Sequence, residues 1–202
     1  MAAVAVVSEL ERWVGQARTR RGAAICIRPL RSDDREREIA FINSLSARSR
    51  YFRLFTPLKF LPRHLLDQLM DIDYRQRMAF VATTQQGGGE QFVGVARYCE
   101  TDEPDTAELG VSVTDSWQRS GVATLLLQQL MTYAREQGIC RLLGLVLPDN
   151  EAMIALARRL RFTVSYDPAQ HLFRMTRELT APRRESGASS PGERPSAPPS
   201  SP

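Results

Sequence analysis

The stretch from residue 107 to residue 138 carries two apolar periods in direct succession. Leu109, Val111 and Val113 alternate with polar or small residues, which predicts a strand with one buried face. After a short polar segment the period changes to 3.6 residues, which predicts a helix packed on a sheet and ended by Gly138. The apolar positions of this helix are Val122, Leu125, Leu126, Leu130, Tyr133 and Ala134. The chain is therefore organised around a strand–turn–helix unit.

The same two periods divide the rest of the chain into elements. Strands are predicted at residues 23–30, 78–84, 91–99, 141–147, 162–166 and 171–178, and helices at 8–18, 32–45, 61–72 and 151–160. The glycine-rich connection at 85–90 predicts a hairpin loop. From residue 23 onward the order is β-α-α-β-β-β-α-β-α-β-β, which indicates a mixed α/β (α+β) fold.

Three segments of different character follow from this pattern. Residues 1–22 form an N-terminal extension with a short amphipathic helix at 8–18, and residues 23–180 form one domain of ordinary size. Residues 181–202 are rich in proline and serine and contain no apolar side chain larger than alanine. Such a segment buries too little surface to order itself, so a disordered tail is predicted.

Composition narrows the class of protein. A hydrophobic content of 43% and a charged content of 25% are typical of a soluble globular protein, and no apolar run is long enough to span a membrane. The three cysteines are widely spaced among strand-like residues, which predicts buried thiols in a cytoplasmic protein and no metal site. The net charge of +4 comes almost wholly from arginine, without the interleaved aromatic residues typical of a nucleic-acid interface.

The turn between the central strand and helix predicts an anion site, because a helix N-terminus presents free N–H groups and a positive dipole. The turn contains neither the GK[ST] nor the GxGxxG signature of common nucleotide sites. Its sequence Gln118-Arg119-Ser120-Gly121-Val122-Ala123 resembles the [RQ]-x-x-G-x-[GA] loop of the GCN5-related N-acetyltransferases, the GNAT family. The order of elements over residues 24–179 is similar to that family as well.

This resemblance implies a mostly antiparallel sheet of six to seven strands flanked by helices, and acetyl-CoA as acyl donor. The pantetheine would then lie along the strand and the pyrophosphate on the loop. The residues that the resemblance assigns to acetyl-CoA are Val111, Ser112, Val113, Gln118, Arg119, Ser120, Gly121, Val122, Ala123 and Thr124. A second segment, Leu147-Pro148-Asp149-Asn150, adds Asn150 as a pantetheine partner, although an ordinary helix N-cap explains the same residue.

A further stretch, Ser46-Ala47-Arg48-Ser49-Arg50-Tyr51-Phe52-Arg53-Leu54-Phe55, is similar to one in bacterial protein-lysine acetyltransferases. The resemblance implies that the acceptor amine is a protein lysine. A turn between helices with aromatic core residues is the alternative explanation for this segment.

Transfer from a thioester to an amine requires a neutral amine, and lysine with a pKa near 10.4 is almost wholly protonated at pH 7. Glu108 matches the strand glutamate of the lysine-acetyltransferase-like members, and it is the candidate general base. A solvated strand glutamate is the alternative. The N–H of Val111 is the candidate donor to the thioester oxygen.

Two positions depart from the family pattern. Ala157 stands where many members have the tyrosine that protonates the departing thiolate, and Arg161 stands where a glycine usually precedes Phe162. The turn into Phe162 is therefore expected to be made in another way. A small-molecule amine acetyltransferase and a non-catalytic acyl-CoA-binding module are the two alternative functions, and the protein is expected to be a monomer or a homodimer.

Overall fold

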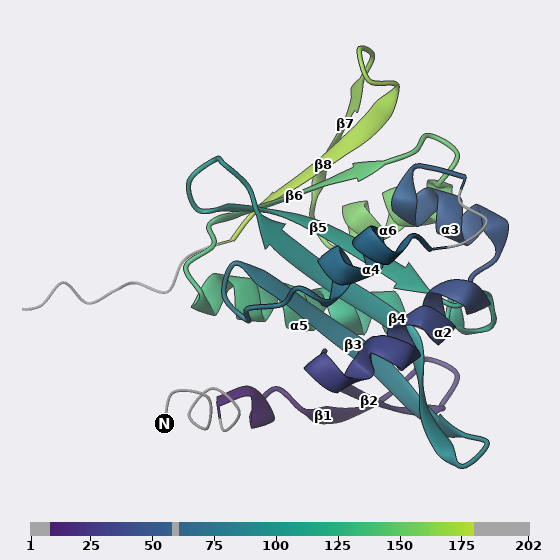
Figure 1. Cartoon of the computed structure of the whole chain (residues 1–202). Helices are drawn as coiled ribbons and strands as arrows, with labels where there is room; N and C mark the ends of the chain where they lie inside the picture. Colours follow the sequence, from purple (N-terminus) through teal and green to yellow (C-terminus); the bar gives the residue numbers. More distant parts are fainter. Residues whose placement is uncertain (1–8, 58–60, 180–202) are drawn as a thin grey trace, which may run out of the picture.

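A computed structural model describes residues 9–57 and 61–179, which form one eight-stranded sheet flanked by helices (Figure 1). The strands are β1 (Gly15–Arg18), β2 (Ala24–Pro29), β3 (Arg77–Gln86), β4 (Gly89–Glu100), β5 (Thr106–Val113), β6 (Arg141–Val146), β7 (Thr163–Asp167) and β8 (Leu172–Glu178). The helices are α2 (Arg35–Ser44), α3 (Ala47–Leu54), α4 (Arg63–Met70), α5 (Val122–Glu136) and α6 (Glu151–Arg159). Two 3-10 turns, η1 (Ser32–Asp34) and η2 (Asp115–Trp117), precede α2 and α5.

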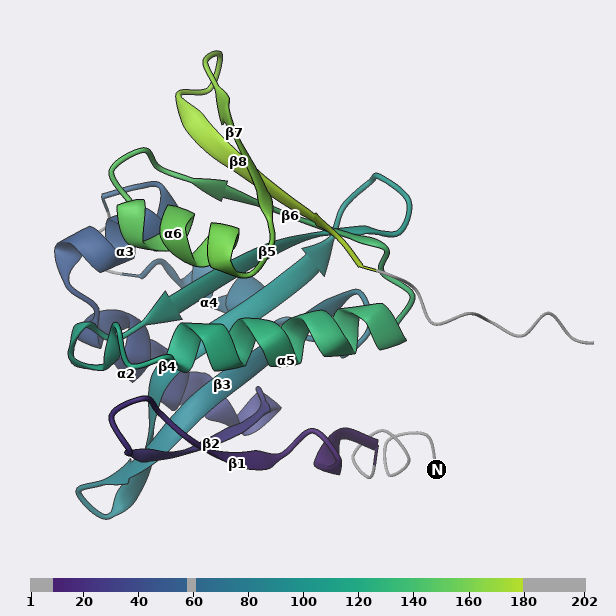
Figure 2. The same ribbon diagram turned by 180° about the vertical axis from the view of Figure 1, so that it is seen from behind.

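The strand order in the sheet is β1-β2-β3-β4-β5-β6-β8-β7. All neighbouring strands are antiparallel except β5 and β6, which are parallel and joined through α5. Helices α2, α3 and α4 cover one face of this sheet and α5 and α6 the other, as the two opposite views show (Figures 1 and 2). The predicted mixed, mostly antiparallel sheet flanked by helices is confirmed.

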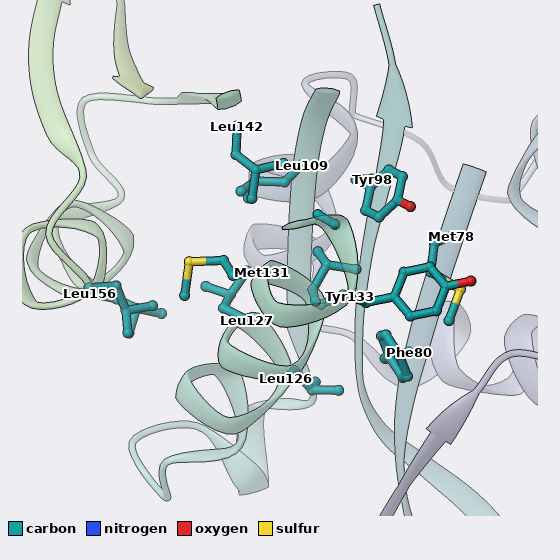
Figure 3. Packing of buried hydrophobic residues seen from close by; sticks show 14 of the residues in the cluster. Met78, Phe80, Tyr98, Leu109, Leu126, Leu127, Met131, Tyr133, Leu142 and Leu156 are labelled. Atoms are coloured by element: carbon teal, nitrogen blue, oxygen red, sulfur yellow. The ribbon is translucent and has the colours of Figure 1, made fainter. Parts of the chain in front are cut away.

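The sheet has a hydrophobic core on each face, and β3 contributes to both. Met78 and Phe80 pack with α5, while Ala79 and Val81 pack with α2 and α4, as expected from the alternation of side chains along a buried strand. On the α5 face, Tyr133 lies edge-on to Phe80 with their ring centroids 5.7 Å apart (Figure 3). This packing fixes α5 across the middle of the sheet.

The helix predicted at residues 8–18 is wrong over its second half. Gly15–Arg18 is strand β1, which pairs with β2 and raises the strand count to eight. Trp13 is buried with its ring 5.0 Å from that of Tyr133, so the segment is held by the core. Because β2 would otherwise expose a row of unpaired N–H and C=O groups, strand pairing overrides the local helical pattern.

Three further predictions concern the 85–90 connection, the cysteines and the C-terminal tail. The 85–90 connection is a hairpin, and its turn is reduced to Gly87 and Gly88, both with positive φ. The cysteines were predicted to be core thiols, which is wrong, because Cys99 is exposed and Cys26 and Cys140 are only half-buried. The predicted disordered tail at 181–202 lies outside the described residues.

The turn from α6 into Phe162 was expected to avoid the conformation of the usual glycine, and this is wrong. Arg161 adopts a left-handed φ of 61°, and the N–H of Phe162 bonds to the carbonyl of Ala157 at 2.9 Å. An arginine therefore occupies a backbone position that favours glycine. Burial and the positive charge of Arg161 also lower the pKa of Arg177, which donates to the carbonyl of Leu160.

We predict that Arg161→Gly stabilises the protein, because it removes backbone strain and the repulsion with Arg177. The expected gain is about 1 kcal/mol, and the melting temperature should rise by about 2–4 °C. Arg158→Gly, inside α6, is the matched control and should lose about 1 kcal/mol. A lower melting temperature for Arg161→Gly would contradict the strain argument.

Candidate active site

The parallel pairing of β5 and β6 ends early. Thr106, Ala107 and Glu108 pair with the first residues of β6, and no pairing is recorded beyond Glu108 in the described chain. On its other side β5 stays paired with β4 as far as Val113. One edge of β5 is therefore open from Leu109 to its end.

The alternation of hydrogen bonds identifies the backbone groups that face this gap. In the β4–β5 ladder, Thr101 N–H bonds to Thr106 C=O and Thr114 N–H bonds to Val93 C=O. Backbone groups of even-numbered β5 residues thus point toward β4, and those of odd-numbered residues point toward β6. The N–H and C=O of Val111 and Val113 face the gap, as a pantetheine chain requires. Ser112 directs its backbone at β4, and its buried hydroxyl has no partner among the described residues.

The predicted phosphate loop lies in the connection between β5 and α5. Arg119 and Gly121 have positive φ values of 58° and 97°, and the hydroxyl of Ser120 donates to the carbonyl of Trp117. Helix α5 begins at Val122, and the first bond of its first turn runs from Leu125 N–H to Gly121 C=O. The N–H groups of residues 122–124 therefore emerge at the positive end of the helix dipole.

A single glycine in β4 brings α5 close to the sheet at this point. A side chain at Gly94 would lie 2.9 Å from Val122 and 3.0 Å from Leu126, and Gly94 pairs with Val113 at the end of β5. The N-terminus of α5 is therefore held beside the open edge of β5. This places the loop and the strand edge in one continuous site.

Helix α3 is fastened to the other side of the loop through Asp115. The carboxylate accepts from the N–H and hydroxyl of Ser46 and from the hydroxyl of Ser49, each at 2.9 Å. Although burial opposes it, these bonds lower the pKa of Asp115. The amide of Gln118 also donates to Ser49, at 3.1 Å. The two serines of the motif at 46–55 thus connect α3 to the loop.

Glu108 lies on the opposite side of β5 from the core residue Leu109, as predicted, and its side chain is exposed. It shares the α3 face of the sheet with Gly110 and Ser112. The guanidinium of Arg53, from α3, lies over Gly110, where its Nη1 is 2.8 Å from the position a β-carbon would take. A carboxylate and a guanidinium therefore meet on this face beside the open edge.

Arg53 belongs to a small network of charges. It makes no hydrogen bond to any residue of 9–57 or 61–179, whereas Arg97, on the neighbouring strand, is paired with buried Glu38. Burial lowers the pKa of Arg53 to about 10, and the charge of Arg97 adds to this while Glu38 and Glu108 oppose it. At pH 7 the guanidinium therefore remains positive.

Asn150 has the structural role of an N-cap, since its side-chain oxygen accepts from Met153 N–H at 3.2 Å at the start of α6. The amide nitrogen remains available as a donor. Ala157, in the same helix, is buried at 1% exposure. Within the described chain its position offers no group that could protonate a thiolate.

The comparisons with known proteins decide the family. A family model described as an acetyltransferase (GNAT) domain matches residues 24–163. This chain belongs to the GNAT acetyltransferases. It is 41% identical over 147 residues to Acetyltransferase PA5475 of Pseudomonas aeruginosa, covering 73% of this chain and 79% of that protein. It is 30% identical to Acetyltransferase Pat of Mycolicibacterium smegmatis over 70% of this chain, and spans only 42% of that relative.

Among solved structures, the GNAT domain of S. lividans PAT superposes with a TM-score of 0.76 at 30% identity, covering 83% of this chain and 98% of that one. As a GNAT acetyltransferase the protein is an N-acetyltransferase that takes its acyl group from acetyl-CoA. The left-handed backbone at Gly121, the free N–H groups of α5 and the open edge of β5 fit this donor. No helix among the described residues has the length and apolar character needed to cross a membrane.

The site also contains residues to which the sequence assigned no role. Arg53 stood in the motif at 46–55 without a function, and Glu38 and Arg97 were not singled out. Their placement depends on α2, α3 and β4 converging on β5. The only sequence signal was the similarity of the 46–55 stretch.

We predict that a negative charge in the first turn of α5 weakens acetyl-CoA binding. Ala123→Glu is favourable for the helix itself, but its carboxylate would repel the phosphates. Ala123→Gln has the same size without the charge, so the difference between the two isolates the electrostatic effect. By calorimetry at low salt, the Glu variant should bind roughly tenfold or more weakly than the Gln variant. Equal affinities in two folded variants would exclude the α5 N-terminus as the phosphate site.

Proposed function

We propose that the protein acetylates the ε-amine of a lysine in a protein acceptor, by direct attack of the neutral amine on the thioester of acetyl-CoA. Glu108 acts as the general base and the N–H of Val111 as the donor to the thioester oxygen. The observation that carries this proposal is the geometry of β5 at the point where it leaves β6. Glu108 faces the α3 side, and three residues further on the backbone of Val111 faces the gap.

In the proposed reaction, the lysine nitrogen replaces the sulfur at the thioester carbon. Glu108 first takes a proton from the lysine ammonium, directly or through one water. The neutral nitrogen then forms a bond to the thioester carbon and releases its second proton to water. The carbon–sulfur bond then breaks and the sulfur leaves as a thiolate. A thiol with a pKa near 8.5 is a fair leaving group without an acid, so Ala157 is compatible with turnover.

Arg53 supports attack by a neutral amine. Its positive charge over Gly110 disfavours a second cation nearby, and a nearby like charge lowers the pKa of an ammonium group. The charge of Arg53 would therefore favour loss of the proton from an amine at this face, against the opposite charge of Glu108. The guanidinium also adds positive potential where negative charge develops in the reaction.

Two observations favour a protein lysine over a small-molecule amine. The 46–55 stretch is similar to one in protein-lysine acetyltransferases, and Ser46, Ser49 and Arg53 all make contacts at the site. Glu108 is exposed, so a long side chain can approach it from solvent.

The acceptor class is tested by thiol release from acetyl-CoA with lysine-containing proteins and peptides against polyamines, aminoglycosides and free amino acids. We expect release above the hydrolysis background with lysine acceptors, and its loss when the lysine is replaced by arginine. Faster release with a small amine would replace the proposed acceptor. Tight binding of acetyl-CoA without release for any amine would favour the non-catalytic module.

We predict that Glu108→Gln lowers the rate near pH 7 by about 10²–10⁴, the usual effect of a positioned base. Acetyl-CoA affinity should hardly change, since Glu108 faces away from the open edge. The loss should shrink as pH rises toward the pKa of lysine, because the amine then arrives neutral. Glu103→Gln, in the turn before β5, is the control. Near wild-type turnover of Glu108→Gln at pH 7 would remove Glu108 from the mechanism.

A further inference from the structure

The turn between β1 and β2 rests on the phosphate loop, although about a hundred residues separate them in sequence. The N–H of Arg20 bonds to the carbonyl of Ser120 at 2.7 Å. The guanidinium of Arg21 reaches the carbonyls of Ser116 and Gln118, each at 3.4 Å. The N-terminal hairpin therefore forms part of the wall around the α5 N-terminus.

The turn itself is well fixed. Thr19 is buried, its N–H bonds to the carbonyl of Ala23 at 2.9 Å, and its hydroxyl accepts from the N–H of Ala23 at 3.1 Å. Gly22, with a φ of 83°, donates its N–H to the carbonyl of Thr19. These bonds use backbone and Thr19 atoms only, so the side chain of Arg20 is not needed to hold the turn.

The side chain of Arg20 lies across Gly121. Its Cγ is 3.2 Å, and its Cδ and Nε are each 3.6 Å, from the position that a β-carbon at Gly121 would occupy. The side chain is exposed, and its guanidinium has no hydrogen bond or ion pair with any residue in the described ranges. The positive charge of Arg20 therefore lies beside Gly121, the residue before the first residue of α5.

This placement is electrostatically unfavourable in the absence of an anion. A positive side chain at a helix N-terminus is repelled by the helix dipole, and Arg119 adds a second exposed cation within the same loop. The nearest acidic residue of the loop, Asp115, is already engaged by Ser46 and Ser49. A phosphate group would remove the repulsion and would match the forked donors of a guanidinium.

We propose that Arg20 is a further binding residue for acetyl-CoA and contacts a phosphate at its nucleotide end, so that the N-terminal hairpin completes the donor site. This rests on the proposed position of the donor at α5. The phosphate is either the pyrophosphate or the 3′-phosphate of the ribose. Both are phosphate groups that a guanidinium can bind. Acetyl-CoA without the 3′-phosphate distinguishes the two.

The test compares Arg20→Met with Arg18→Met by calorimetry with acetyl-CoA at two salt concentrations. Methionine keeps a flexible stem over Gly121 and removes the guanidinium, with its charge and its N–H donors. Arg18 lies on the same hairpin but is occupied by the carbonyl of Gly22 at 3.0 Å. We expect Arg20→Met to bind acetyl-CoA roughly five- to fiftyfold more weakly, with a smaller salt dependence, and Arg18→Met to stay within about twofold of wild type.

Each outcome has a defined meaning. If the penalty of Arg20→Met disappears with acetyl-CoA that lacks the 3′-phosphate, Arg20 contacts that phosphate, and if it persists, Arg20 contacts the pyrophosphate. Wild-type affinity and salt dependence of a folded Arg20→Met protein would overturn the proposal. If Ala123→Glu still impairs binding in that case, the donor site at α5 stands without the hairpin. Failure of the wild-type protein to bind acetyl-CoA would overturn both.

Discussion

The separation of β5 from β6 is the constraint on which the site depends. Pairing stops after Glu108, so that the backbone groups of Val111 and Val113 face a gap where a sheet would normally satisfy them. Buried backbone groups without partners are costly, and the proposed pantetheine, an extended chain with amide groups, would supply the missing bonds. The antiparallel pairing with β4 continues to Val113 and keeps the strand rigid while its other edge is open.

Close packing on the two faces of β5 brings a helix N-terminus and a guanidinium to the open edge of the strand. Gly94 lets α5 approach until its N-terminus stands beside the end of β5, and Gly110 lets the guanidinium of Arg53 lie on the strand from the opposite face. The absence of a side chain at Gly94 lets the helix N-terminus approach, and its absence at Gly110 lets a charged group approach. Because the sheet separates them, the proposed donor phosphates and the proposed acceptor amine are served by different faces of the same strand.

Positive groups lie near β5 on both faces of the sheet. On one face the α5 dipole, Arg119 and Arg20 act at the same place, and on the other Arg53 lies close to Arg97. The buried carboxylate of Glu38 holds Arg97, while Asp115 is used to fasten α3. Glu38 and Asp115 are thus engaged in structural contacts, whereas Arg20 and Arg53 have no hydrogen-bond partner for their guanidinium groups among the described residues and are available to an anion.

The strand–turn–helix unit was readable in the sequence because its signals are local. Alternation along residues 107–113, the 3.6-residue period after Val122 and the loop around Gly121 each arise from backbone geometry within a few residues. The same local argument failed at residues 15–18, where the helical pattern lost to the unpaired edge of β2 and to the burial of Trp13. It failed again at Arg161, since hydrogen bonds at the end of α6 hold a left-handed conformation that arginine alone disfavours.

By itself, then, the sequence determined the types of the elements that it predicted from residue 23 onward and the face of β5 on which Glu108 lies, because periodicity fixes these before any packing occurs. It predicted no helix at Ala47–Leu54, where the structure has α3. The tertiary structure alone decided which distant residues share the site. Arg53 reaches Gly110 from α3, which Ser46 and Ser49 connect to Asp115, and Arg20 reaches Gly121 from the turn after β1, which pairs with β2 in the sheet. Such contacts join segments tens of residues apart, and their free energy comes from the assembled sheet, which no local pattern of residues encodes.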